Sequence, residues 1–373
     1  MIHRTKQITS LGQSLWIDFI SREMLRGGRL AQLIEHGITG LTSNPSIFQK
    51  SIAGGAEYDA EIRELSRTGR SDYEIYETLA LRDIADAADL MRPVFNETHG
   101  RDGFVSIEVN PEFAHDTERT TAEGHRLFAA IRRPNVMIKV PATEAGLPSI
   151  SALLGEGINV NVTLIFGVEM YERVMQAYLD GLRAYQRRGG APANVSSVAS
   201  FFVSRVDTAI DKMLEAHTGD GEDEAESLLG QAGIANAKIA YARFKAVFNG
   251  EQFNDLRAAG ARVQRPLWAS TSTKNPAYSP TMYVDNLIGP NTVNTLPPQT
   301  FDALRDAGTV AQSIEQEVDA AYALFRQLSE LGIEVRAVSD QLLVDGVKLF
   351  ADSFQMLLKD IATKRAKLDH QAA

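Results

Sequence analysis

Residues 136–140 of this chain read Val136-Met137-Ile138-Lys139-Val140. Side chains alternate between the two faces of a β-strand, so the three branched aliphatic residues share one face. Met137 and Lys139 share the other. A charged side chain at such a position is unusual, because the strands of parallel sheets are commonly apolar on both faces. The stretch therefore predicts a strand whose second face borders a polar space.

The same one-sided polarity returns along the chain. Residues 104–110 place Glu108 opposite aliphatic side chains, and residues 15–19 place Asp18 opposite apolar neighbours. Residues 158–163 alternate Ile and Val with Asn and Thr. Four less regular stretches also read as strands, namely residues 38–44, 195–200, 266–272 and 291–296.

Helical patterns separate these strands. Apolar residues recur at helical spacing from Ile314 to Leu328, with Ser313 and Gln316 as the expected capping box and Gly332 as the expected stop. A strong apolar stripe over residues 343–361 predicts a C-terminal helix. Strands that alternate with helices indicate βαβ units and a parallel sheet.

A closed barrel accounts for strands that are apolar on one face only. The apolar face packs on a ring of helices, and the polar face points inward toward the mouth where βα-loops build active sites. The sequence therefore predicts an α/β fold, a (β/α)8 TIM-type barrel that forms one domain over residues 1–373. We expect helical insertions within residues 49–102 and 206–265, an acidic turn at residues 219–224, and the C-terminal helix.

The composition limits the class of protein. The chain has 373 residues, with 38 Lys and Arg against 48 Asp and Glu, for a net charge of −10. This charge argues against nucleic-acid binding, which needs basic surface. The absence of cysteine excludes disulfides and thiolate chemistry and fits a reducing compartment. With no signal-peptide pattern and no run of about 18 apolar residues, we expect a cytoplasmic protein with no membrane partner.

Lys139 is the strongest candidate for a catalytic residue. Burial favours the neutral form of a lysine amine, and a neutral amine in a barrel mouth is a Schiff-base nucleophile. Glu108 and Asp18 place two carboxyl groups on the same inner surface, where they are suited to the proton transfers of such a reaction. Two other readings stay open from the pattern alone: a strand-end lysine that reaches solvent, and a structural ion pair with the carboxylates.

Uncharged and basic residues at the strand ends are candidates for substrate binding. Amides and hydroxyls suit a polyol or sugar, and arginine grips phosphate with two donors. A turn, a hydrogen bond inside the barrel or plain surface charge would leave the same patterns. The candidates are Asn44, Asn161 and Thr163 for hydroxyl groups, and Arg205, Ser272 and Lys274 for an anion.

No cofactor site is indicated. The chain contains neither GxGxxG nor GxxxxGK[ST], the glycine-rich loops that hold nucleotides. Its seven histidines show no HxH or HExxH spacing. We therefore expect neither a metal nor an organic cofactor.

Four stretches that carry these residues resemble transaldolases, and they come in that family's order. Residues 37–48 contain Thr42-Ser43-Asn44-Pro45-Ser46, which looks like the signature after the second strand. Residues 136–143 look like the family's Schiff-base lysine strand, and residues 158–166 are similar to its Asn-x-Thr strand. Residues 200–207 resemble its sixth strand with the phosphate-binding arginine, and the tail over 338–361 is similar to the longer bacterial members.

The resemblance implies a metal-free, Schiff-base enzyme of the pentose phosphate pathway. Such enzymes move a three-carbon dihydroxyacetone unit from sedoheptulose 7-phosphate to glyceraldehyde 3-phosphate, giving erythrose 4-phosphate and fructose 6-phosphate. By matching position, Lys139 would form the imine and Asp18 would take the proton from the carbon-four hydroxyl. Glu108 would act through a water held with Thr163.

The resemblance also implies a binding role for the remaining candidates. Asn44, Asn161 and Ser200 would hold the three-carbon unit, Phe202 would shape the pocket, and Arg205, Ser272 and Lys274 would bind the terminal phosphate. Many relatives carry arginine where Lys274 aligns, so this sequence keeps the charge there but loses the two-donor fork.

Two other functions remain open. A stand-alone fructose 6-phosphate aldolase would share the lysine but release dihydroxyacetone to water; Glu108 and the chain length favour transfer. A sugar-phosphate-binding barrel without catalysis would not need Lys139, Asp18 and Glu108 together. In each case the partners are sugar phosphates, and the sequence permits a homodimer.

Overall fold

Eight parallel strands close into one barrel in the order β1 to β8. The computed structural model describes residues 4–218 and 221–370. The predicted (β/α)8 TIM-type barrel is confirmed. Its strands are β1 Gln13–Ile17, β2 Ile38–Leu41, β3 Phe104–Glu108, β4 Val136–Pro141, β5 Val160–Ile165, β6 Ser197–Phe202, β7 Arg265–Ala269 and β8 Thr292–Leu296.

The strand register places the inward polar side chains at one level. Glu108 on β3 pairs with Lys139 on β4, and Lys139 pairs with Asn161 on β5. Four strands end earlier than predicted, among them β3 at Glu108 and β7 at Ala269. β1 ends at Ile17 and β2 at Leu41, so Asp18 and Asn44 lie in the βα-loops just beyond them. Both loops open at the carboxyl end of the barrel, where βα-loops build active sites.

Apolar side chains fill part of the barrel interior beneath Lys139, and a buried ion pair of Arg265 with Asp102 lies nearer the amino ends of the strands. Trp16, Met137 and Leu267 belong to an apolar cluster separate from the one between the strands and the helices. The Trp16 ring presses on Gly40 of β2, where an added Cβ would lie 2.4 Å from the ring. A side chain at residue 40 would therefore collide with the Trp16 ring. The polar layer of Lys139 consequently has an apolar floor.

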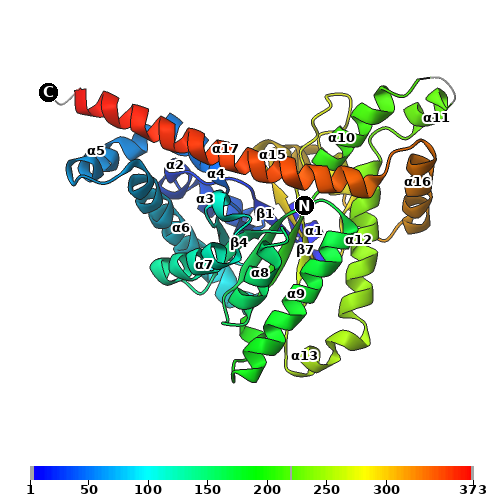
Figure 1. The fold of residues 1–373 in the computed structure, drawn as a ribbon, viewed down its shortest axis with the longest axis horizontal. Coiled ribbons are helices and arrows are strands. Elements are labelled where there is room, and N and C mark those ends of the chain that lie inside the picture. Colours follow the sequence, from blue (N-terminus) through cyan, green and yellow to red (C-terminus); the bar gives the residue numbers. More distant parts are fainter. Residues whose placement is uncertain (1–3, 219–220, 371–373) are drawn as a thin grey trace.

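Helices surround the barrel (Figure 1). The described helices are α1 Arg4–Ser10, α2 Arg22–Arg26, α3 Arg29–Glu35, α4 Pro45–Gly54, α5 Asp59–Arg67, α6 Asp72–Glu97, α7 Thr117–Ile131, α8 Gly146–Leu154, α9 Val168–Arg187, α10 Ser204–Glu215, α11 Glu222–Ser227, α12 Ala232–Phe248, α13 Asn254–Ala258, α14 Met282–Asn286, α15 Pro298–Ala307, α16 Val318–Glu330 and α17 Val335–His370. Short 3₁₀ turns are η1 Ala56–Tyr58, η2 Pro111–Phe113, η3 Pro192–Asn194 and η4 Glu251–Phe253.

Two local predictions are wrong. Ser313 does not cap a helix: its hydroxyl donates to the carbonyl of Asp285 and accepts from the amide of Ile288, so it fastens a loop instead. Helix α16 consequently begins later, at Val318. Part of the expected acidic turn is helix α11, whereas Gly219 and Asp220 lie outside the described residues.

The C-terminal helix α17 is the longest described element and crosses the molecule beside the barrel mouth (Figure 1). Its predicted apolar stripe is confirmed, because Phe350, Phe354, Leu357 and Ile361 are all buried. It packs on α4, α5, α6 and α10, which follow or connect the barrel strands. None of the helices described is both long enough and apolar enough to cross a membrane.

Candidate active site

A pocket opens at the carboxyl end of the barrel and encloses about 570 Å³, counting its open mouth. Most of the predicted site residues line it, and Glu108 and Asn161 lie directly beside it. The lining residues are Asp18, Thr42, Asn44, Lys139, Thr163, Ser200, Phe202, Arg205, Ala269, Ser270, Ser272, Lys274, Thr295, Pro297 and Phe350.

Lys139 points into this pocket from the middle of β4. Its side chain is only 5% exposed, so its amine lies inside the barrel and not in solvent. The Nζ atom donates a hydrogen bond to the carbonyl of Ser43 at 3.1 Å. It lies 3.8 Å from Oε2 of Glu108, which is too long for a direct hydrogen bond. The amine is thus near a carboxyl group without being locked to it.

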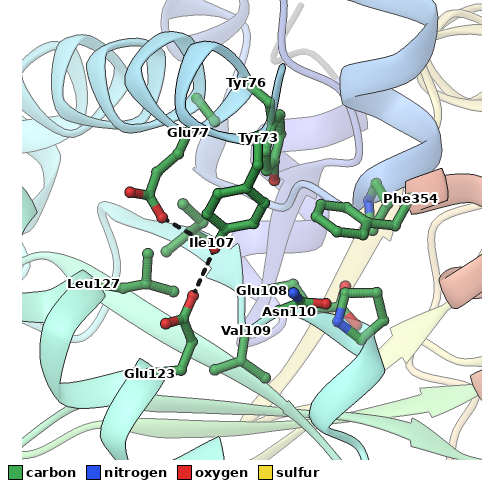
Figure 2. A pocket seen from close by; sticks show the side chains of 13 residues that line it. Tyr73, Tyr76, Glu77, Ile107, Glu108, Val109, Asn110, Glu123, Leu127 and Phe354 are labelled. Carbon is green, nitrogen blue, oxygen red and sulfur yellow. Dashed lines mark hydrogen bonds between the residues drawn. The ribbon is translucent and has the colours of Figure 1, made fainter. Parts of the chain in front are cut away.

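Glu108 is buried as deeply as Lys139. Its side chain is 5% exposed, and Oε2 has no hydrogen-bond partner in the described part of the chain. Burial raises the pKa of Glu108 to about 7; the charge of Lys139 opposes this rise and that of Asp18 adds to it. Glu108 also borders a second, smaller cavity with Tyr73, Tyr76 and Phe354 (Figure 2). A carboxyl group with this pKa both gives and takes protons near neutral pH.

Asp18 lines the same pocket as Lys139, from the loop that follows β1. Its Oδ1 accepts a hydrogen bond of 2.6 Å from the hydroxyl of Thr42, which in turn lies 2.7 Å from the hydroxyl of Thr295. Burial raises the pKa of Asp18, while the charge of Lys139 and the Thr42 hydrogen bond oppose the rise. The carboxyl group is therefore held in one orientation and keeps an affinity for protons.

Amide and hydroxyl groups form a layer beside the lysine. Asn161 donates to the hydroxyl of Ser106 at 3.0 Å and accepts from that of Ser200 at 2.7 Å. The Asn161 amide is thus fixed by hydrogen bonds inside the barrel. The buried hydroxyl of Thr163 has no partner among residues 4–218 and 221–370. Asn44 caps helix α4 by accepting from the amide of Ile47, so it serves as a turn residue and also lines the pocket.

Two cations gather at the outer end of the pocket. The guanidinium of Arg205 lies 5.3 Å from the centre of the Phe202 ring, and the amine of Lys274 donates to the hydroxyl of Ser272 at 2.7 Å. Burial lowers the pKa of both cations, and Arg205 lowers that of Lys274 further. Neither has a carboxylate within ion-pair distance in the described structure. Two unpaired positive groups favour an anionic ligand group.

Comparison with known proteins identifies the family of this chain. A family model described as transaldolase/fructose-6-phosphate aldolase matches residues 15–361, nearly the whole chain. The chain belongs to the transaldolase/fructose-6-phosphate aldolase family. It is therefore an enzyme of a transferase family, and the resemblance drawn from the sequence is confirmed.

Curated transaldolases are similar over almost their full length. The chain is 46% identical to transaldolase 2 of Nostoc sp. (strain PCC 7120), over 97% of this chain and 98% of that protein. It is 46% identical to the transaldolase of Trichodesmium erythraeum, over 97% of each chain. It is also 46% identical to the transaldolase of Mycobacterium tuberculosis (strain H37Rv), over 98% of this chain and 97% of that one.

Some features of this transaldolase-family site escaped the sequence analysis. Thr42 and Ser43 lie within the signature quoted from the sequence, so their presence at the site could have been predicted. Their hydrogen-bond partners, Asp18 and Lys139, come from other parts of the barrel and could not. Leu164 has a left-handed backbone with φ of 60°, and the β5–β6 register shifts around it. The place of Phe350 in the pocket could not be predicted, because a helical pattern shows that a residue is buried but not which residues it contacts.

Proposed function

We propose that the chain is a transaldolase that carries a dihydroxyacetone unit as an imine on Lys139. The donor is sedoheptulose 7-phosphate, the acceptor is glyceraldehyde 3-phosphate, and the setting is the pentose phosphate pathway. The observation that carries the proposal is the buried amine of Lys139, placed in one pocket with Asp18 and with the cations Arg205 and Lys274. Sequence similarity to curated transaldolases supports the same function.

The proposed reaction begins at the ketose carbonyl. The amine of Lys139 attacks it, and loss of water from the carbinolamine gives an iminium ion. This ion accepts the electron pair of the bond between carbons three and four as that bond breaks. The aldose phosphate leaves, and the remaining three-carbon enamine attacks the aldehyde of the acceptor. Hydrolysis of the new imine then frees Lys139.

Each proton transfer has a candidate group. Asp18 takes the proton of the carbon-four hydroxyl as the bond breaks and returns it in the reverse step. Glu108 acts as acid and base for carbinolamine formation and loss, through a water that the unpartnered hydroxyl of Thr163 also holds. Asn44, Asn161 and Ser200 bind the three-carbon unit.

The outer end of the pocket recognises the phosphate. Arg205 and Lys274 supply charge and Ser272 a hydroxyl, while Phe202 orients the guanidinium of Arg205. A lysine in place of a second arginine keeps the charge but gives one donor direction at a time.

The domain organisation, the cellular location and the oligomeric state belong to the same proposal. We take residues 1–373 as one domain, because the eight strands share one closed sheet and α17 packs back on it. A cytoplasmic location and a homodimer complete the proposal. The absence of cysteine is compatible with that compartment.

A two-substrate assay separates transfer from simple aldol cleavage. Fructose 6-phosphate mixed with erythrose 4-phosphate is expected to give sedoheptulose 7-phosphate and glyceraldehyde 3-phosphate, measured by chromatography with mass detection. Free dihydroxyacetone as the main three-carbon product would favour the stand-alone aldolase instead. No turnover of either kind, with binding of fructose 6-phosphate retained, would favour a non-catalytic barrel.

The rate of imine formation is expected to rise with pH and to level off above about pH 7, the pKa of Glu108. Below this pH Glu108 already carries its proton and cannot act as a base. Above it the carboxylate of Glu108 can take the proton that is released when the carbinolamine forms. The pH profile of kcat/KM for fructose 6-phosphate measures this rise.

The Glu108→Gln variant is the control for this profile. Glutamine cannot take the proton, so kcat/KM is expected to fall and the rising limb near pH 7 to disappear. A limb that stays near pH 7 in the variant would assign it to another group, with Asp18 the first to test.

A further inference from the structure

Phe350 places an aromatic ring over the proposed nucleophile. It belongs to helix α17, yet it lines the pocket together with Lys139, Thr163 and Ser200. The Nζ atom of Lys139 lies 5.9 Å from the centre of its ring. Phe350 is only 4% exposed, so the ring fills space at the pocket wall and does not project into solvent.

Polar contacts hold this part of α17 against the βα-loops. The hydroxyl of Ser46 donates to that of Ser353 at 2.9 Å, and Gln49 donates to Asp360 at 3.0 Å. Further along, the amine of Lys364 pairs with Asp59 at 2.8 Å. Because Ser46 and Gln49 belong to α4, which begins at the pocket, Phe350 is fixed relative to Lys139 by more than its own contacts.

Phe354 lies one turn further along the same face of α17. Its ring packs edge-on against Tyr73 and Tyr76, with centres 6.1 and 5.4 Å apart (Figure 2). It borders the smaller cavity on the other side of Glu108, and it does not line the substrate pocket. The two phenylalanines therefore share a helix and a face but serve different cavities.

We propose that Phe350 decides whether the three-carbon unit is transferred or lost to water. This inference rests on the proposed imine mechanism. After the carbon–carbon bond breaks, protonation of the enamine carbon gives an iminium ion on Lys139. Water can add to that ion; the carbon–nitrogen bond then breaks, the amine recovers, and free dihydroxyacetone leaves. Transfer requires that this side reaction stay slow until the acceptor arrives.

The ring opposes the side reaction in two ways. It occupies volume beside the imine nitrogen that water would otherwise fill, and a hydrocarbon face offers such water no hydrogen bonds. Its π-face also lies within about 6 Å of the amine, the range in which an aromatic ring stabilises a cation. Both effects act on the intermediate and not on phosphate binding, which takes place at Arg205 and Lys274.

The test compares Phe350→Leu and Phe350→Ala with Phe354→Leu. For each variant, fructose 6-phosphate and erythrose 4-phosphate are supplied, and the ratio of free dihydroxyacetone to sedoheptulose 7-phosphate is measured. We expect Phe350→Ala to raise this ratio by on the order of tenfold, the lower end of the effect of an apolar wall in a binding pocket. Phe350→Leu should raise it less. Phe354→Leu should lower the melting temperature but leave the ratio unchanged.

Two results would overturn the proposal. A wild-type ratio in Phe350→Leu and Phe350→Ala would show that the ring does not govern water access. An equal rise in Phe354→Leu would assign the effect to loosening of α17. If Phe350→Ala does not fold, Phe350→Leu alone decides, by the same comparison. Failure of the imine mechanism itself is distinguishable, since borohydride would then trap no adduct on Lys139 even in the wild type.

Discussion

A Lys139→Met variant is expected to lose transfer by at least about 10⁴-fold, because removing the nucleophile of a covalent mechanism removes the intermediate itself. Methionine fills a similar volume in the buried position, so the barrel should remain folded. Its thioether leaves Glu108 without a cation nearby, but a carboxyl group with a pKa of about 7 can become neutral at little cost. The measurement is the two-substrate transfer assay, with the melting temperature recorded alongside.

Borohydride trapping gives this prediction a direct readout. In wild-type enzyme with fructose 6-phosphate, reduction should place a stable three-carbon adduct on the peptide that contains Lys139, identified by mass. Lys238 offers a matched control, since its side chain is 6% exposed but it lies on α12 outside the pocket. Lys238→Met should keep both the adduct and the transfer. An adduct on any other lysine would contradict the proposed mechanism.

An Asp18→Asn variant is expected to lower kcat by about 10²- to 10⁴-fold, the usual contribution of a general base. The asparagine carbonyl can still accept the Thr42 hydroxyl, so the local geometry is preserved while proton transfer is lost. Since Asp18 is assigned to bond cleavage and not to imine formation, the borohydride adduct should still form in this variant. Single-turnover cleavage of fructose 6-phosphate measures the affected step.

Asp285→Asn is the matched control for this variant. Asp285 is also a partly buried aspartate; burial raises its pKa, and it accepts the hydroxyl of Thr281 at 2.8 Å, but it lies outside the pocket. Its substitution should leave cleavage unchanged. Loss of the adduct in Asp18→Asn would instead assign Asp18 to imine formation, and retained cleavage would exclude it as the base.

The barrel and the centre of its site could be predicted because both follow from strand alternation. A two-residue period fixes which side chains point inward, and a parallel register then sets Glu108, Lys139 and Asn161 side by side. The ends of strands were less predictable, since Asp18 and Asn44 continue the alternating pattern after the ladder has stopped. Ser313 resembled a helix cap, but tertiary hydrogen bonds to Asp285 and Ile288 decided its role.

The contact of Trp16 with Gly40 and the position of Phe350 over Lys139 could not be predicted from the sequence. Trp16 reads as one more strand residue until its contact with Gly40 is known. Phe350 reads as one more stripe residue, because periodicity shows which face of a helix is buried but not what covers it. Arg205 and Lys274, by contrast, were predicted together as candidates for an anion site, and the structure places both in one pocket.

The position of α17 has a consequence for synthesis of the protein. A chain leaves the ribosome from its N-terminus, and structure begins to form before translation ends. The last barrel strand is complete at Leu296, whereas Phe350 and its fastening residues emerge only afterwards. A nascent chain can therefore bring Lys139, Glu108 and Asp18 together before Phe350 covers the pocket. The pocket is therefore completed only after all eight barrel strands have been made.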